Sequence, residues 1–465
     1  MSVPLLLVVL FDGLGHNEFT QYYKEFGNLT KAHDECVTAR NGVIPVFPTL
    51  TTPNLMSIST GLYSESHFIT GNKMKPTNSS DLHEHPFELF TESDEDGTWF
   101  DNGVSMPIWT LNEMASTPSS KRHSGGMLWA GSGAPYRKKK IKYYKHYDAN
   151  VSWYDEVDEV LKWFTDKTEP ANCVFLYFDE PDLTNHEHGP NSPEVKLQID
   201  RVDGIIGYLM DKINEHNLKD SLNIIFTSDH GVVEIPPGNF NEINKLKIPT
   251  SQYETNKNGV IWHINPYPKY YGAVYNAFLE GSKFMNYSFW DKRDFPKSAH
   301  FKNGKYVGSM ILVSDLGFIT VPYAFQNLKI NTIGGHGYNN THPEMRSFFL
   351  ARGPAFNTSV VLDTFKNVDL YPLMCSILNL NPGPNNGTFN RVSAMLNVKS
   401  LFPSSEKAID YAAISVGIVL VILVIVVLTL FGHRMYQKYV KKSNAAKYGL
   451  VSDGALMSDT DSDGL

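Results

Sequence analysis

The sequence predicts an α/β fold in which helices cover both faces of a mostly parallel central sheet. Three hydrophobic segments, at positions 4–11, 172–178 and 222–226, each end next to acidic residues. Helical patterns at positions 153–164 and 192–215 alternate with these segments. Such alternation of buried strands with amphipathic helices is typical of a parallel sheet that is covered on both sides.

The acidic residues mark the carboxyl ends of the three predicted strands. Asp12 ends the first segment, Asp182 lies four residues beyond the second, and Asp229 and His230 follow the third. In open α/β sheets, ligands bind outside the carboxyl ends of the strands. The sequence therefore predicts a ligand site at this edge of the sheet.

Two more histidines extend this set of candidate metal ligands. His186 follows Asp182 by four positions, which is close enough for both to bind one ion, and His336 lies in the segment GGHGYNN. Mixed histidine and aspartate ligands suit zinc. The spacing alone leaves open whether the six side chains converge: Asp12, Asp182, His186, Asp229, His230 and His336.

A candidate nucleophile lies in the segment FPTLTTPN, at positions 47–54. Thr51 stands just before an expected helix start, because Pro53 suits the first helical turn. The positive end of the helix dipole and its free N–H groups can hold phosphate oxygens there. A threonine hydroxyl is a poor nucleophile near neutral pH unless a base or a metal ion activates it. The alternative interpretation of Thr51 is a helix-capping threonine in a loop.

The motifs together resemble the ectonucleotide pyrophosphatase/phosphodiesterases of the alkaline phosphatase superfamily, and in particular a short, type I membrane-anchored member. The resemblance covers about residues 5–400, and its motifs occur in order. They are DG at Asp12, FPTLTTPN, TGLYSES followed by Gly71-Asn72, EPDLTNHEHGP at 180–190, SDHG at 228–231 and GGHGYNN at 334–340.

The resemblance implies two zinc ions and a covalent phosphothreonyl intermediate on Thr51. It implies that Asp182, His186 and His336 hold one ion, and that Asp12, Thr51, Asp229 and His230 hold the other. It further implies that Asn72 contacts a phosphate oxygen.

Some positions depart from the family pattern. Thr52 replaces the phenylalanine that usually follows the nucleophile and stacks on the nucleobase, Asn185 replaces a glycine, and Ser64 replaces a proline. Tyr147 is our first choice for a remaining stacking ring, with Tyr143 and Tyr144 as alternatives. Nucleotide preference is therefore less firmly predicted than the phosphoryl chemistry.

Other regions carry weaker signals. Residues 73–126 are polar and predict an insertion over the site rather than core, residues 255–303 are aromatic and irregular and predict a second excursion, and residues 361–380 predict a closing helix. Cys36, Cys173 and Cys375 are too few and too scattered for a disulfide scaffold, although one pair can bridge.

A membrane anchor is predicted at residues 412–431, an uncharged apolar segment that is long enough to cross a bilayer. Basic residues follow it, so the positive-inside rule places residues 432–465 in the cytoplasm, with a catalytic domain at 1–400 and a stalk at 401–411 outside. Seven glycosylation sequons fall on the predicted outer side, at Asn28, Asn78, Asn150, Asn286, Asn339, Asn357 and Asn386. The start reads as a strand rather than a signal peptide, so we expect the true N-terminus to be missing.

The leading hypothesis is a cell-surface zinc hydrolase that cleaves extracellular nucleotides to nucleoside 5'-monophosphates. A choline-phosphodiester hydrolase is the alternative enzyme, for which the acidic segment 92–96 is a candidate cation pocket, and a non-catalytic surface protein of the same fold is the alternative class. The 41 basic and 49 acidic side chains indicate no nucleic-acid-binding surface. In the tail, residues 448–451 resemble a sorting signal for adaptors, and residues 458–463 a kinase site.

Overall fold

The computed structural model describes residues 3–75, 87–88, 97–323, 333–358, 360–397 and 429–440. The chain divides into two compact units, residues 1–401 and residues 402–465. In the second unit, residues 429–440 form a helix. The folded unit 1–401 contains all the candidate site residues.

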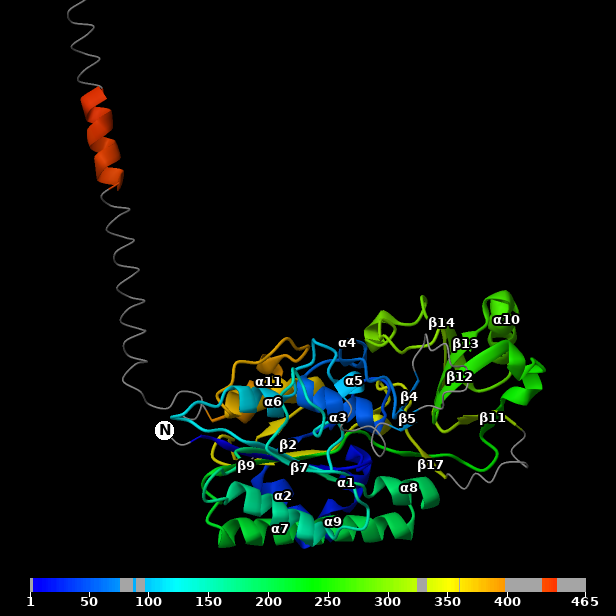
Figure 1. Cartoon of the computed structure of the whole chain (residues 1–465), viewed down its shortest axis with the longest axis horizontal. Helices are drawn as coiled ribbons and strands as arrows, with labels where there is room; N and C mark the ends of the chain where they lie inside the picture. The colour runs from blue at the N-terminus through cyan, green and yellow to red at the C-terminus, as the bar shows by residue number, and fades with distance from the viewer. Residues whose placement is uncertain are drawn as a thin grey trace, which may run out of the picture. The chain divides into compact units, whose positions relative to one another are not determined.

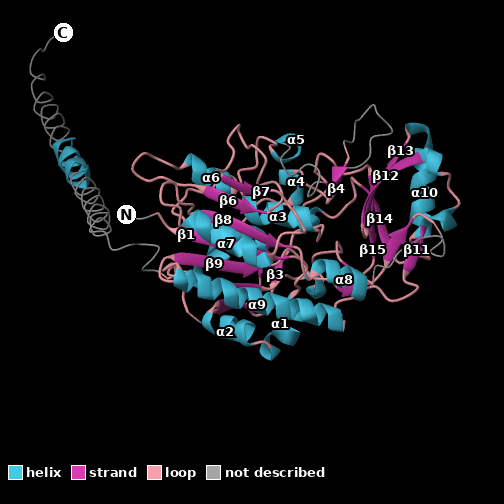
Figure 2. Cartoon of the chain, turned by 60° about the horizontal axis from the view of Figure 1, so that its bottom comes forward, coloured by secondary structure: helices cyan, strands magenta, loops and turns pink. Residues whose placement is uncertain are grey.

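An eight-stranded sheet forms the centre of this unit, and Figure 2 shows its strands β9, β1, β8 and β6 among the helices that cover them. Its central strand β1 (Leu5–Phe11) pairs in parallel with β8 (Cys173–Phe178) and β9 (Leu222–Thr227). Only β18 runs antiparallel to its neighbours in the described sheet. The other members are β19 (Val361–Leu362), β2 (Val37–Ala39), β18 (Phe349–Arg352), β6 (Ser124–Met127) and β7 (Tyr143–Lys145), in the order β19-β2-β18-β9-β1-β8-β6-β7.

Helices cover both faces of the sheet, which confirms the predicted fold class (Figure 1). One layer contains α1 (His16–Tyr22), α2 (Gly27–Glu35), α7 (Trp153–Phe164) and α9 (Pro193–Glu215), and the other contains α3 (Thr51–Thr60), α6 (Ile108–Met114) and α11 (Leu370–Ile377). Because both faces are covered, the central strands are continuous apolar runs. Leu6 to Phe11 are all fully buried.

The two helices predicted from their periodicity form as expected. Helix α7 spans the predicted residues 153–164. Helix α9 begins after Ser192, whose hydroxyl accepts a hydrogen bond from the Val195 N–H at 3.2 Å, with Pro193 at its first position. A side-chain cap followed by proline is a strong helix-start signal, which explains why the start of α9 can be predicted from the sequence.

A smaller lobe packs beside the central sheet and appears at the right of Figures 1 and 2. The predicted excursion at 255–303 falls in this lobe, but the expectation of irregular structure was wrong. The lobe contains an antiparallel sheet and helix α10 (Tyr271–Gly281), with a core of its own around Trp262 and Phe278. The sheet has the order β12 (Tyr253–Asn258), β13 (Ile261–Pro266), β15 (Met310–Ser314) and β14 (Tyr287–Asp291).

Several short elements connect the larger ones. Helices α4 (Ser64–His67), α5 (Gly97–Phe100) and α8 (Asp182–His188) are each one or two turns long. Four two-stranded pairs complete the described structure: β4 (Lys73–Met74) with β5 (Phe87–Glu88), β10 (Val233–Glu234) with β17 (Gly334–Gly335), β11 (Phe240–Glu242) with β16 (Ile319–Val321), and β3 (Val43–Ile44) with β20 (Phe365–Lys366).

Two further expectations are corrected in part. The predicted insertion at 73–126 contains helix α6 and strand β6, which belong to the core, and the closing helix is shorter than predicted because β19 and β20 precede α11. All three cysteines are buried free thiols. Within the described residues, no helix is long and apolar enough to cross a membrane, and residues 412–428 of the predicted span lie outside them.

The placement of α6 in the core makes a testable prediction. Trp109 is fully buried and packs edge-on against Phe175 of β8, with ring centroids 5.3 Å apart. Trp109→Ala should therefore lower the free energy of unfolding by about 3–5 kcal/mol, measured by denaturant unfolding followed by circular dichroism. Met114→Ala on the same helix, where the side chain is 52% exposed, should change it by less than about 0.5 kcal/mol. Equal effects of the two variants would contradict the core assignment.

Candidate metal centre

Three neighbouring parallel strands deliver the carboxylates of the site. Asp12 follows β1, Asp229 follows β9, and Asp182 begins α8 shortly after β8. The strands lie side by side in the order β9-β1-β8, so their carboxyl ends form one edge. The Asp182 N–H donates to the Asp12 carbonyl at 3.1 Å, which ties two of these strand ends together. The three carboxylates therefore meet at the edge that the sequence indicates.

Gly13 allows this close approach. Its φ of +67° lies in the left-handed region, and a Cβ atom there would stand 2.7 Å from Asp182 Oδ1 and 2.9 Å from its Cα. Any larger residue would push Asp182 away from the strand end, and would also strain the backbone. The dipeptide Asp12-Gly13 is thus a geometric requirement of the site.

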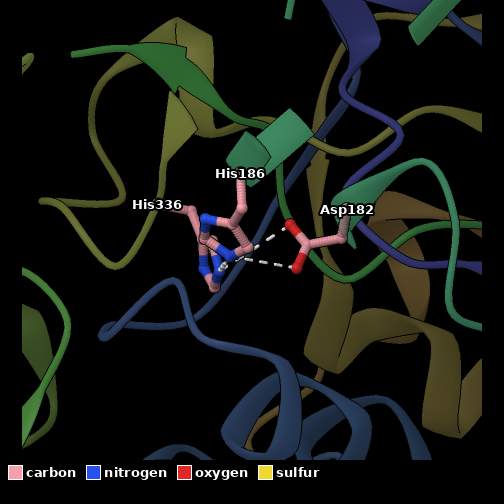
Figure 3. Close-up of side chains that lie close together, drawn as sticks. All are labelled: Asp182, His186 and His336. Atoms are coloured by element: carbon pink, nitrogen blue, oxygen red, sulfur yellow. Dashed lines mark hydrogen bonds and ion pairs between the residues drawn. The ribbon is translucent and has the colours of Figure 1, made fainter. Parts of the chain in front are cut away.

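Two histidines from distant parts of the chain meet beside Asp182 (Figure 3). His186 Nε2 lies 3.2 Å from Asp182 Oδ2, and His336 Nε2 lies 3.7 Å from Asp182 Oδ1. The His186 side chain comes from α8, and His336 follows β17, which pairs with β10. The two Nε2 atoms are 3.1 Å apart.

The hydrogen bonds of the two rings determine where their protons lie. His186 Nδ1 is 2.9 Å from the Gly334 carbonyl oxygen, and His336 Nδ1 is 2.9 Å from the Thr49 carbonyl oxygen. Carbonyl oxygens only accept hydrogen bonds, so both Nδ1 atoms carry hydrogen. Burial lowers the pKa of His186, but the Asp182 carboxylate beside its Nε2 outweighs this and raises the pKa to about 9, so without a metal ion this Nε2 holds a proton toward Asp182. A metal ion between the two Nε2 atoms would take the place of that proton and bind the lone pairs of both rings.

A second group of ligand atoms surrounds His230, which is fully buried. Its Nε2 lies 3.0 Å from Asp229 Oδ2, 3.6 Å from Asp12 Oδ1 and 3.4 Å from the Thr51 hydroxyl oxygen. There are two sets of possible ligand atoms among the described residues, and within each set all atoms lie within 4.8 Å of one another. One set comes from Asp182, His186 and His336, and the other comes from Asp12, Asp182 and His230. Asp182 belongs to both sets, so the two candidate sites are adjacent.

Each carboxylate is held by one oxygen and leaves the other without a hydrogen bond. Asp12 Oδ2 accepts from the Tyr177 hydroxyl at 2.5 Å, and Asp229 Oδ1 accepts from the Gly13 N–H at 3.1 Å. Their other oxygens, Asp12 Oδ1 and Asp229 Oδ2, are buried without a hydrogen bond, as is Asp182 Oδ1, and each faces a histidine Nε2 at 3.0–3.7 Å. Buried carboxylate oxygens are costly unless a cation, either a protonated histidine or a metal ion, neutralises them. These residues therefore fit divalent metal ions.

The pKa shifts of the site reflect the same crowding. Burial, with the neighbouring Asp229 and Asp182, raises the pKa of Asp12 well above its usual range. Burial would also raise the pKa of Asp182, but the imidazoles of His186 and His336 lower it. Two causes lower the pKa of His336 to about 3: mainly its burial, and then the nearby His230. The low pKa favours the neutral ring that metal binding requires.

Thr51 begins helix α3 and points its hydroxyl at this cluster. The residue is 5% exposed, and the preceding Leu50 is extended and provides no side-chain cap. The amide group of Asn54, in the same motif, accepts from the Val46 N–H and donates to the Pro48 and Leu50 carbonyls. These bonds hold the loop that carries Thr51, so the hydroxyl has a defined position at the helix start.

The other predicted substrate contacts differ in exposure. Asn72 is half-buried, and its Oδ1 accepts the Thr52 N–H at 2.9 Å, so its amide nitrogen remains available beside Thr51. Thr52 is fully buried and its hydroxyl has no hydrogen-bond partner. The structure thus offers no exposed surface of Thr52 for a nucleobase.

Tyr147 packs against Tyr177, the tyrosine whose hydroxyl bonds the candidate ligand Asp12. Its ring packs edge-on against Tyr177 at 6.3 Å, and its hydroxyl donates to Asp179 Oδ2 at 2.8 Å. Tyr143 instead stacks on Trp163 at 5.5 Å. Tyr177 was not singled out from the sequence, because an aromatic residue inside an apolar strand is usually core. Only its contact with Asp12 distinguishes it.

A cleft of about 350 Å³ opens beside the group formed by Asp182, His186 and His336. Its described lining includes His186, His336 and Asn72, and two lysines, Lys73 and Lys257, but no acidic residue. Lys257 also lies over the Trp262 ring, 4.7 Å from its centroid. This lining favours an anionic ligand over a cationic one.

Comparison with known proteins gives a family match over most of the folded unit. The model of the family "Type I phosphodiesterase / nucleotide pyrophosphatase" matches residues 6–339. The mouse ectonucleotide pyrophosphatase/phosphodiesterase family member 7 is 32% identical over 397 residues, covering 84% of this chain and 87% of that protein. The human bis(5'-adenosyl)-triphosphatase ENPP4 is 32% identical over 395 residues, covering 84% of this chain and 82% of that protein.

Solved structures share the same fold. Murine ectonucleotide pyrophosphatase/phosphodiesterase 5, in an inactive threonine-to-alanine variant in complex with AMP, superposes with a TM-score of 0.77 at 30% identity. The match covers 85% of this chain and all of that chain. The human protein of the same name also gives a TM-score of 0.77, at 29% identity over 84% of this chain.

The ligand geometry predicts the effect of removing one imidazole. Replacing His186 with alanine should lower the bound divalent metal by about one ion per chain, measured by elemental analysis of the purified protein, because Asp182 and His336 alone leave the first group incomplete. His188→Ala, two residues further along α8 and paired only with glutamates in the described structure, should leave the metal content unchanged. A full metal complement in the His186 variant would contradict the assignment.

Proposed function

Because the chain belongs to the type I phosphodiesterase / nucleotide pyrophosphatase family and is a hydrolase of that family, we propose that it is a zinc-dependent enzyme that cleaves extracellular nucleotides. The bonds cleaved are phosphodiester and pyrophosphate bonds, and the product is a nucleoside 5'-monophosphate. The observation that carries the proposal is the Thr51 hydroxyl at a helix start, 3.4 Å from His230 Nε2 and beside two groups of metal-ligand atoms.

Two zinc ions suit the donor set. Asp182, His186 and His336 would hold one ion, and Asp12, Thr51, Asp229 and His230 would hold the other. Imidazole nitrogen and carboxylate oxygen are the donors that zinc binds in catalytic sites. When bound, such ions lower the pKa of a hydroxyl and neutralise charge that develops on phosphoryl oxygens.

Thr51 is the proposed nucleophile. Its oxygen forms a bond to phosphorus while the bond to the leaving group breaks, and the hydroxyl proton is lost, so the nucleoside 5'-phosphoryl group becomes esterified to Thr51. Water then hydrolyses this ester, which releases the nucleoside 5'-monophosphate and restores the Thr51 hydroxyl. The free N–H groups at the start of α3 and the Asn72 amide are placed to donate to the phosphoryl oxygens. In murine ENPP5, the variant described as inactive carries a threonine-to-alanine replacement, which supports a catalytic threonine in this family.

The nucleotide assignment rests on the lining of the cleft and on the relatives. Lys73 and Lys257 of the cleft suit a phosphate chain, and Tyr147, which the cleft lining does not include, is the proposed stacking ring for a base. A relative's structure contains AMP, and another relative is named a bis(5'-adenosyl)-triphosphatase. A choline group would need an anionic pocket, and its predicted candidate, residues 92–96, lies outside the described residues. The full set of ligand types argues against a non-catalytic role.

The proposed location is the plasma membrane, with residues 1–400 extracellular and residues 432–465 cytoplasmic. The apolar segment 412–431 and the basic residues after it support this orientation. Sequons at Asn150, Asn286 and Asn386 lie at exposed positions, as glycosylation requires. Adaptors that bind the tail segment 448–451 are proposed cytoplasmic partners.

The nucleophile prediction uses a threonine on the same helix as its control. Thr51→Ala should reduce hydrolysis of the p-nitrophenyl ester of thymidine 5'-monophosphate to below about one thousandth of the original kcat, because no other oxygen of the motif can form the covalent intermediate. Thr60→Ala, whose hydroxyl donates to the Met56 carbonyl at the far end of α3, should retain activity within about twofold. Comparable activity of both variants would refute the covalent mechanism.

The nucleotide prediction separates base binding from phosphoryl chemistry. Tyr147→Ala should raise the KM for the thymidine ester by about 10-fold or more, but should leave that for methyl p-nitrophenyl phosphate nearly unchanged, because the latter has no base. Tyr147→Phe keeps the ring and loses only the bond to Asp179, so it should behave like the original enzyme. If both KM values rise equally in Tyr147→Ala, the ring does not face the base.

A further inference from the structure

Side chains of strand β12 in the smaller lobe form hydrogen bonds with the backbone next to Asn72. Asn258 Oδ1 accepts the Lys73 N–H at 2.7 Å, and Asn258 Nδ2 donates to the Lys73 carbonyl at 3.0 Å. One side chain thus replaces a full pair of backbone hydrogen bonds. Asn256 Nδ2 donates to the same carbonyl at 2.9 Å, and Glu254 forms an ion pair with Lys75 at 3.1 Å.

These contacts come from one face of the strand. Residues 254, 256 and 258 alternate along β12, so their side chains share a face. The side chains of Asn256 and Asn258 are 7% and 4% exposed, respectively. Both polar atoms of the Asn258 amide are bonded to the Lys73 backbone, whereas Asn256 bonds it through Nδ2 alone and its Oδ1 is buried without a partner. A buried amide costs least when both of its polar atoms are bonded, so Asn258 is the residue of this face that is built to hold the facing segment in one position.

The residue before Asn72 shows how close the approach is. A Cβ atom on Gly71 would lie 2.6 Å from Asn258 Cγ and Oδ1. Contacts of that length do not occur, so any side chain at position 71 would displace either Asn258 or the segment itself. Gly71 and Asn258 therefore work as a pair.

We propose that Asn258 is a positioning residue that holds Asn72 against Thr51 through the Lys73 backbone, so that the smaller lobe sets the phosphate-binding geometry. Asn72 is fixed on its other side by its Oδ1, which accepts the Thr52 N–H at 2.9 Å. The Asn72 amide thus lies between the start of α3 and β12. This inference rests on the proposed role of Asn72 in contacting a phosphoryl oxygen, but it does not depend on which nucleotide is the substrate.

The lobe also contains a matched control. Asn241 is 1% exposed and grips the Asn286 backbone in the same way, since its Oδ1 accepts the Asn286 N–H at 2.9 Å and its Nδ2 donates to the Asn286 carbonyl at 2.8 Å. None of the described cleft-lining residues belongs to this second pair. Asn241→Ala therefore removes the same two kinds of bond at a site where no effect on phosphate binding is expected.

The test is a double-mutant cycle on the full-length protein with methyl p-nitrophenyl phosphate as substrate. Asn258→Ala should lower kcat by between about 10-fold and 100-fold with a smaller change in KM, since displacement of a transition-state donor by about 1 Å has effects of that size. Asn72→Ala should lower kcat further, and adding Asn258→Ala to it should cause no additional loss. Asn241→Ala should keep kcat within about twofold of the original value, even if its melting temperature falls as much as that of Asn258→Ala.

The outcomes distinguish the inference from the proposed function. Unchanged kcat in Asn258→Ala, or losses that multiply in the double variant, would overturn the positioning role while the original enzyme remains active. If the original enzyme cleaves no phosphodiester, the proposed function fails and the inference fails with it. Should Asn258→Ala not fold, the isosteric Asn258→Asp keeps the acceptor for Lys73 N–H and loses the donor, and its kcat should fall between those of the original and Asn72→Ala.

Discussion

The site depends on two imidazole Nε2 atoms that face each other beside the Asp182 carboxylate. His186 Nε2 and His336 Nε2 are 3.1 Å apart because backbone carbonyls of Gly334 and Thr49 hold the opposite nitrogen of each ring. Thr49 lies two residues before the candidate nucleophile Thr51, so the loop that orients one ligand also leads into α3. Two Nε2 atoms at this distance can both bind one cation, and the fold brings the two rings together from residues 150 positions apart.

The central sheet was predictable because apolar strands and the acids that follow them are visible within short stretches of sequence. Strands β1, β8 and β9 are mainly apolar and each is followed within two residues by an acid, and α7 and α9 show a clear helical period. The ligand types were predictable for the same reason. Their convergence was not, because it depends on strand order and on the return of residues 334–336 to α8, which no local pattern encodes.

The errors have physical causes as well. Helix α6 lies within a polar stretch, and averaging over residues 73–126 concealed the short buried run at Ile108 and Trp109. In the smaller lobe, β12 is largely polar and β13 is buried over four consecutive residues, so neither strand shows the alternation of a half-buried sheet. Tyr177 and Asn258 were missed because a core tyrosine and a strand asparagine acquire meaning only from the partners Asp12 and Lys73.

The candidate carboxylate ligands therefore come from the edge of the central sheet, and Lys257 of the smaller lobe lines the cleft beside them. If Asp182, His186 and His336 form a metal site, one ion would bind both facing imidazoles. Anomalous diffraction at the zinc absorption edge, from crystals of zinc-loaded active protein, locates such an ion. We expect a peak at about 2.0–2.1 Å from both His186 Nε2 and His336 Nε2 and in contact with Asp182. Active crystals with no anomalous peak between the two rings would contradict it.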